Sequence, residues 1–154
     1  MIFYLAIALF VGIVFYVISH QPGTADESDS VQGGIAQYFV QISRLQNQGH
    51  DSFFVTAMAS DQTRFVQVSA NKSGGAWTYQ FDMPVTDWSR NYAATIQGEA
   101  EKRGLETRRV NGTVAMQFLD VDFGDRARHD TFVIWVIEDV FGLPKDETFD
   151  ITWG

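Results

Sequence analysis

The first 19 residues, MIFYLAIALFVGIVFYVIS, are mostly apolar and contain no charged side chain. A helix of this length, rising about 1.5 Å per residue, covers roughly the hydrocarbon thickness of a bilayer. Tyr4 and Tyr16 lie near its ends, where interfacial anchors are expected. A secretory signal would have a positive n-region and a shorter apolar core, although Gly23-Thr24-Ala25 offers small residues at a cleavage spacing. We therefore expect residues 1–19 to form an uncleaved transmembrane helix, with a cleaved signal as the alternative.

The residues after this segment bear on its orientation. The first basic side chain is Arg44, whereas cytoplasmic flanks within roughly 15 to 20 residues of a span usually carry Lys or Arg. This asymmetry favours a single-pass membrane protein whose soluble domain lies on the extracytoplasmic side. Residues 20–33 combine Pro, Gly, Ser and acidic residues with almost no apolar content, which predicts a flexible linker.

The rest of the chain, residues 34–154, is long enough for one domain but not two. A hydrophobic content of 45%, with 13 Phe and 4 Trp, predicts a packed core. The net charge of −8 makes nucleic acid a poor partner. The chain has no cysteine, which excludes disulfides, thiol nucleophiles, thiolate metal sites and covalent haem attachment.

Hydrophobic periodicity and turn residues predict the order of elements in this domain. Apolar residues recur at helical spacing after Gly34, Asp87 can cap a second helix, and Asn111-Gly112 is a strong hairpin signal. The predicted helices are 34–48, 87–103 and 125–142, and the predicted strands are 52–59, 64–70, 76–83, 105–110 and 113–123, with a short edge strand at 147–153. The order α-βββ-α-ββ-α predicts an α+β fold in which helices cover an antiparallel sheet.

Aromatic side chains are the candidate protein-binding residues. Trp77, Tyr79 and Phe81 alternate along one strand and so share one face of the sheet, which is either the core face or an open binding platform. Trp135 lies in a helical run that is apolar on more than one face, and that run is either deeply buried or covered by a partner. Trp153 lies near the end of the sequence, which favours an exposed anchor.

One polar stretch is a candidate for metal chemistry. Asp120 and Asp122 project from the same strand face, and Asp125 and His129 are four residues apart on the following helix. Carboxylates and an imidazole can hold a divalent ion, but helix capping by Asp125 and charge pairing with the nearby arginines explain the same residues without one. The chain has neither the Gly-x-Ser-x-Gly motif nor the His-Glu-x-x-His motif. We therefore expect no catalytic residue, no cofactor and no metal.

Two short stretches carry a family resemblance: Arg64-Phe65-Val66-Gln67-Val68, and the stretch VIEDVFGLP at residues 136–144. They resemble the bacterial chaperone-like domains related to type III secretion chaperones and the YbjN family, over residues of about 37–154. The resemblance implies a non-catalytic α/β fold that binds peptides or another protein, often as a dimer or a paired domain, and it offers no catalytic residues to transfer. Such domains are usually soluble in the cytoplasm. A bacterial protein with the predicted span would instead lie in the inner (cytoplasmic) membrane.

Three functions follow as hypotheses. The first is a protein-binding domain that acts as a chaperone-like factor or as an accessory subunit of a membrane protein complex, with residues 1–19 in the lipid bilayer. The second is an immunity protein that neutralises a secreted toxin, because small acidic proteins suit basic toxin surfaces. The third is a metal-dependent enzyme built around Asp120, Asp122 and His129.

Overall fold

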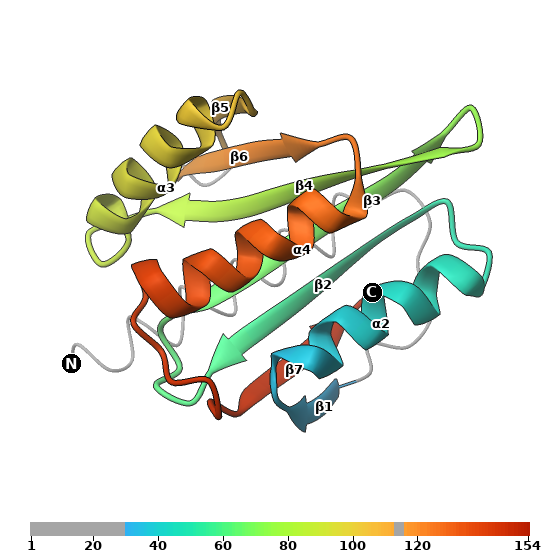
Figure 1. Ribbon diagram of the computed structural model, residues 1–154, viewed down its shortest axis with the longest axis horizontal. Helices are drawn as coiled ribbons and strands as arrows, with labels where there is room; N and C mark the ends of the chain where they lie inside the picture. The colour runs from blue at the N-terminus through green and yellow to red at the C-terminus, as the bar shows by residue number, and fades with distance from the viewer. Residues whose placement is uncertain (1–29, 113–115) are drawn as a thin grey trace.

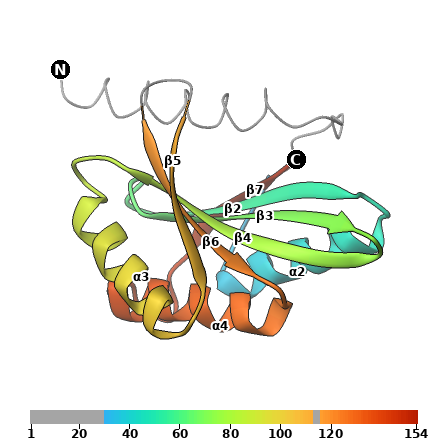
Figure 2. The ribbon, with the colours of Figure 1, turned by 90° about the horizontal axis from the view of Figure 1, so that it is seen from above.

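The computed structural model describes residues 30–112 and 116–154. In this part of the chain, seven antiparallel strands form one sheet in the order β1-β7-β2-β3-β4-β6-β5 (Figure 1). The strands are β1 (Ser30–Gly33), β2 (Ser52–Ala59), β3 (Phe65–Ser73), β4 (Ala76–Val85), β5 (Glu106–Asn111), β6 (Gln117–Phe123) and β7 (Phe149–Trp153). The helices are α2 (Ile35–Asn47), α3 (Arg90–Lys102) and α4 (Arg126–Trp135), and a π-helical turn, η1 (Val136–Val140), continues α4. Figure 2 shows that α2, α3 and α4 all cover the same face of the sheet. The described architecture is therefore a two-layer α+β sandwich.

The transmembrane part of the predicted fold class is corrected. The predicted span, residues 1–19, lies outside the described residues. Within residues 30–112 and 116–154, no helix is both long enough and apolar enough to cross a membrane. Helices α2 and α3 have 13 residues each, which gives a length of about 20 Å, and both pack one apolar face on the sheet. Over the described residues, this finding corrects the prediction of a single-pass inner-membrane protein with an extracytoplasmic domain, and membrane insertion forms no part of the function proposed below.

Strand β1 forms where the sequence predicted linker. The expected linker ran to residue 33, but Ser30–Gly33 pairs with β7, with Val31 opposite Ile151. The Gln32 side chain also donates to Asp150, with 2.7 Å between Nε2 and Oδ1. A short polar edge strand is held by backbone hydrogen bonds. Its sequence therefore lacks the alternation of apolar and polar residues that predicts a strand. As a result, β7 is an interior strand between β1 and β2, and not the predicted edge strand.

Two local predictions differ in detail. The second helix begins at Arg90, and Asp87 forms an exposed ion pair with Arg90 (3.2 Å) where a cap was expected. Ser89 precedes the helix, and its hydroxyl donates to the Pro84 carbonyl at 2.5 Å. Strands β5 and β6 pair as the predicted hairpin, but Asn111 lies opposite Gln117 as the last residue of β5, whereas the sequence placed it in the turn. Residues 113–115, where the second strand of that hairpin was expected to begin, lie outside the described residues.

The hydrophobic core lies between the sheet and the helix layer. Successive strand residues point to opposite faces, so alternate residues of each strand face the helices. Ile42 of α2, Phe81 of β4 and Phe132 of α4 are fully buried there. The Phe81 and Phe132 rings meet edge to face, with 5.8 Å between centroids. This contact places α4 over the middle of the sheet, between α2 and α3 (Figure 1).

Candidate protein-binding site

The three aromatic residues of β4 lie on the core face. Tyr79 and Phe81 are only 5% and 0% exposed, and both belong to the core beneath the helices. Trp77 is partly buried and packs on Phe53, with 5.4 Å between ring centroids. Of the two alternatives for this face, the structure therefore supports a core face and not an open binding platform.

Trp153 is buried, which contradicts the prediction of an exposed anchor. Its side chain is 5% exposed, and its backbone pairs with Val55 of β2. The Arg44 guanidinium of α2 lies 5.4 Å from the centre of its ring. Because β7 is an interior strand, Trp153 becomes part of the packed layer although it lies near the end of the sequence.

Trp135 remains partly exposed at the end of α4. The Arg103 guanidinium lies 5.0 Å from the Trp135 ring centre and 5.6 Å from that of Phe132. The neighbouring Ile134 is 39% exposed, a large value for an aliphatic side chain on a helix that packs on a sheet. An arginine over an aromatic ring holds both side chains in place. The end of α4 thus presents an ordered apolar surface, formed by Ile134 and Trp135.

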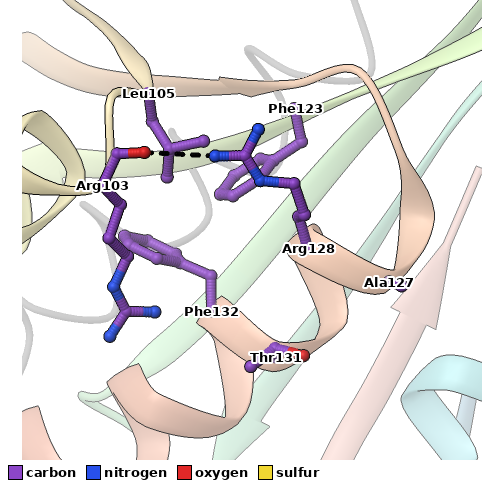
Figure 3. Close-up of a pocket in the computed structure, with 7 residues that line it drawn as sticks. All are labelled: Arg103, Leu105, Phe123, Ala127, Arg128, Thr131 and Phe132. Atoms are coloured by element: carbon purple, nitrogen blue, oxygen red, sulfur yellow. Dashed lines mark hydrogen bonds between the residues drawn. The ribbon is translucent and has the colours of Figure 1, made fainter.

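A groove lies beside this surface, between the C-terminal end of α3 and α4. Its volume is about 260 Å³. The residues that line it are Arg103, Leu105, Phe123, Ala127, Arg128, Thr131 and Phe132. Figure 3 shows Arg128 reaching from α4 towards the end of α3, close to Leu105 and Phe123. We call this the α3–α4 groove; it combines apolar rings with two guanidinium groups.

The two arginines of the groove have different partners. Arg103 forms an ion pair with Glu99, with 2.9 Å between Nε and Oε1. Arg128 donates from Nη2 to the Arg103 carbonyl oxygen at 3.2 Å. That carbonyl lies at the C-terminal end of α3, where the helix dipole places partial negative charge. Among the described residues, no carboxylate forms an ion pair with Arg128.

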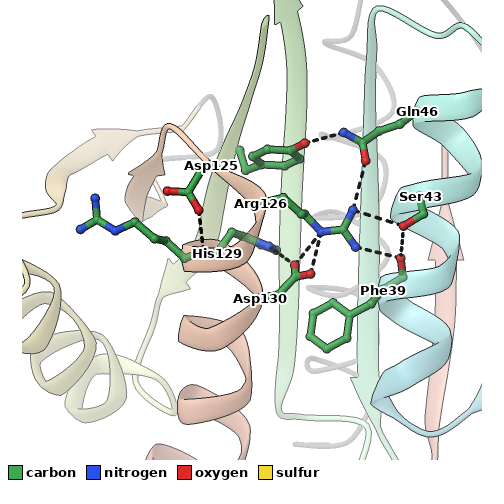
Figure 4. Close-up of polar contacts among 9 residues, drawn as sticks. Phe39, Ser43, Gln46, Asp125, Arg126, His129 and Asp130 are labelled. Atoms are coloured by element: carbon green, nitrogen blue, oxygen red, sulfur yellow. Dashed lines mark hydrogen bonds and ion pairs between the residues drawn. The ribbon is translucent and has the colours of Figure 1, made fainter.

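A second polar cluster joins α4 to α2 (Figure 4). Arg126 pairs with Asp130 at 2.7 Å and donates to the Phe39 carbonyl at 2.9 Å and to Gln46 Oε1 at 3.1 Å. Gln46 in turn donates to the Tyr79 hydroxyl. The Arg126 guanidinium therefore has acceptors on both helices. We call this cluster the α2–α4 junction, and its contacts are those of a structural clamp.

His129 belongs to the same junction and is fully buried. Its Nδ1 lies 2.9 Å from Asp130 Oδ1. Burial lowers the pKa of the imidazole, and the nearby Asp130 carboxylate only partly opposes this shift. A buried neutral imidazole within the core is suited to packing and not to proton transfer with a bound substrate.

The structure does not bring together the metal-binding residues of the enzyme hypothesis. Leu119, Val121 and Phe123 face the core, so Asp120 and Asp122 point to the opposite face of the sheet, whereas His129 lies on the helix side. Among residues 30–112 and 116–154, no group of three His, Cys, Asp or Glu residues is placed to hold a metal ion. The structure therefore separates the ligands that the enzyme hypothesis needs.

The capping alternative for the same stretch is confirmed. Asp125 Oδ1 accepts a hydrogen bond from the Arg128 backbone N–H at 2.8 Å, which makes Asp125 the N-cap of α4. The charge pairing takes a different form from the one expected. Arg126 pairs with Asp130, one turn further along α4, and not with Asp125.

Asp82 is a buried acid that the sequence analysis missed. It lies opposite Asp120 on the sheet face away from the helices, and each is 8% exposed. Ser69 Oγ and Gln80 Nε2 donate to its carboxyl oxygens at 2.5 and 2.6 Å. Burial raises the pKa of Asp82 to about 7, and the nearby Asp120 carboxylate adds to the shift. Burial also raises the pKa of Asp120, against the opposing charge of Arg108. A cross-strand pair of this kind becomes visible only once the register is known.

The α3–α4 groove was likewise absent from the sequence-based candidates. Trp135 was the one candidate beside it, and the only available signal was the pair of basic residues Arg103 and Arg128 near predicted helix ends. Comparisons of the chain with protein family models, curated proteins and solved structures found no match. The resemblance to chaperone-like domains therefore stays a prediction, and function is argued from the surface of the molecule.

Proposed function

We propose that this chain is a non-catalytic domain that binds another protein through the end of α4, as a chaperone-like factor or as an accessory subunit of a larger complex. The observation that carries the proposal is the apolar surface formed by Ile134 and Trp135. Both side chains reach solvent at the end of α4, whereas the neighbouring Phe132, Val133 and Val136 are fully buried.

The composition of this surface supports a protein partner. Trp and Arg are the residues most enriched among the side chains that dominate interface energetics. Trp135 is held against Arg103 before any partner arrives, so little side-chain entropy remains to be lost on binding. The buried acids and the buried histidine, by contrast, have their places in the sheet and the core and lie outside the groove.

Site-specific photo-crosslinking would test the proposal. A photoreactive benzoylphenylalanine replaces Ile134 in the full chain, expressed in the source cells. Val110 of β5 is the matched control position, because it is 41% exposed, close to the 39% of Ile134, and lies on a different face of the molecule. We expect a discrete protein adduct at position 134 and none of the same mass at position 110. No adduct at position 134, or identical adducts at both positions, would contradict the proposal.

The immunity hypothesis differs from this proposal only in the identity of the partner. A secreted toxin in the adduct at position 134 would support immunity. A resident protein of the same cell would support the chaperone-like or accessory role. Mass spectrometry of the crosslinked band separates the two.

A further inference from the structure

We infer that the α3–α4 groove receives an acidic segment of a protein partner, with one apolar side chain in the groove and a carboxylate on Arg128. This inference rests on the proposed function and adds the chemistry of the partner. Three features of the groove lead to it: its size, its apolar lining, and the incomplete pairing of one guanidinium.

The size of the groove favours a side chain over a whole small molecule. Pockets for drug-sized ligands take about 300–1,000 Å³, whereas this groove has a volume of about 260 Å³. Leu105 and Ala127 supply the apolar lining that solvent reaches, while the neighbouring Phe123 and Phe132 are 2% and 0% exposed. The Phe132 ring packs on the Phe123 ring, with 5.2 Å between the ring centroids. A preformed apolar groove of this size accommodates an aliphatic or aromatic side chain.

The charge at the edge of the groove selects a carboxylate. A guanidinium has five N–H donors, and the one side-chain contact of Arg128 that the structure shows uses a single nitrogen. Donors therefore remain for a carboxylate, which guanidinium groups bind in a two-point geometry. Arg103 serves as the contrast, because Glu99 already pairs with it.

The net charge of the chain limits where an acidic partner can dock on its surface. With a net charge of −8, the protein repels acidic partners over most of its surface. An acidic segment is favoured where guanidinium groups gather, as they do at this groove. Charge complementarity of this kind fixes where and in which orientation a partner docks.

Peptide display provides the test, with the immobilised full chain and a random peptide library. We expect the enriched peptides to contain Asp or Glu within a few residues of Leu, Ile, Phe or Trp. Synthetic copies of these peptides are then titrated by fluorescence anisotropy against the wild type and four variants. Arg128→Gln removes the charge and Arg128→Glu inverts it. Ala127→Trp fills the groove from an exposed position on α4. Arg90→Glu is the control, since Arg90 is exposed and lies at the opposite end of α3.

We expect the enriched peptides to bind Arg128→Gln about tenfold more weakly than the wild type, and Arg128→Glu more weakly still, because a charge-assisted hydrogen bond is lost. It also expects loss of binding for Ala127→Trp and no change for Arg90→Glu, with thermal melting to verify that each variant folds. The inference is overturned if no peptide is enriched, if the enriched peptides lack acidic residues, or if Arg128→Glu binds them as well as the wild type. Each of these results, obtained together with a discrete adduct at position 134, would leave the proposed function in place. A missing adduct at position 134 would instead contradict the proposed function.

Discussion

Helix α4 meets a helix on each side, and two of its arginines, only two residues apart, behave differently there. At the α2–α4 junction, Arg126 has a carboxylate, a backbone carbonyl and a side-chain amide as acceptors. At the α3–α4 groove, Arg128 has one backbone carbonyl and remains exposed. All three guanidinium nitrogens of Arg126 donate in the first contact set, whereas Arg128 uses one nitrogen in the second and keeps donors free beside an apolar groove. The difference teaches that the number of free donors, and not the residue type, distinguishes the structural Arg126 from Arg128, for which binding is proposed.

The most direct test of this difference is to truncate each arginine in a separate variant. Arg126→Ala should lower the free energy of unfolding by about 3 kcal/mol, because Asp130 and two acceptors on α2 lose a partly buried donor. Arg128→Ala should lower it by about 0.5 kcal/mol or less, as for exposed side chains with few contacts. Urea unfolding followed by circular dichroism measures both values. Equal losses would remove the distinction between the junction and the groove.

A second prediction concerns Asp82, which lies on the other face of the sheet. The folded protein keeps the Asp82 proton up to a pKa of about 7, whereas the unfolded chain releases it near the ordinary aspartate pKa of 3.8. Stability therefore falls as pH rises between these two values, because the folded state binds more protons there. Asp82→Asn should be more stable than the wild type at pH 8 by about 4 kcal/mol, and this gain should vanish near pH 4.

The control for this prediction is Asp87→Asn, which changes a fully exposed carboxylate. It should shift the unfolding free energy little at either pH. If Asp82→Asn shows the same small shift at pH 8, then burial of Asp82 does not carry the expected penalty.

The third prediction uses His129 to distinguish the junction from the groove by pH. Burial lowers the pKa of folded His129, while the unfolded imidazole has the ordinary histidine pKa of 6.5. Below pH 6.5 the unfolded state binds the proton first, so the stability contributed by neutral His129 is complete above 6.5 and is lost on acidification. We expect this contribution to fall by about 1 kcal/mol per pH unit just below 6.5. In His129→Gln, which keeps a donor for Asp130, the loss between pH 6.5 and 5 should be smaller, as measured by urea unfolding at each pH. An unchanged slope would show that the junction does not depend on the charge of His129.

We expect the smallest effect on stability from a substitution in the exposed surface at the end of α4. Ile134→Ala should change the free energy of unfolding by less than about 0.5 kcal/mol, because the side chain is 39% exposed. When the photoreactive residue replaces the neighbouring Trp135, Ile134→Ala should reduce the yield of the crosslinked protein adduct. Val110→Ala, a matched loss of an exposed aliphatic group, should leave the adduct unchanged. A large loss of stability in Ile134→Ala would mean that this side chain serves packing.

Local patterns were predictable from the sequence because local physics decides them. Asp125 was expected to cap α4, and its hydrogen bond to the Arg128 N–H depends only on residues three apart. The alternation of Trp77, Tyr79 and Phe81 placed them on one face for the same reason, since the period of a strand is two. Order and type of the helices and central strands followed from these short-range signals.

The features that the sequence did not reveal depend on distant contacts. Strand β1 owes its conformation to β7, more than a hundred residues later, and carries no apolar pattern of its own. Burial of Trp153 likewise depends on distant contacts, because its strand pairs with β2 and Arg44 of α2 lies over its ring. The Asp82–Asp120 pair needs the β4–β6 register, and the α3–α4 groove needs the packing of two helices. Residues 1–19 favoured a membrane span on hydrophobicity alone, and no described helix has the length for one.

The interior position of β7 also constrains how the chain acquires its fold during synthesis. Strand β2 is made early, but its partner on one side, Phe149–Trp153, is made almost a hundred residues later. Until then the β2 edge, with Val55 and Ala57, offers unpaired backbone groups to other chains. The sheet cannot be completed until residues 149–153 have been made and have left the ribosomal tunnel. The β2 edge that pairs with β7 is thus exposed to other chains for longer than the opposite edge, which pairs with the strand made directly after it.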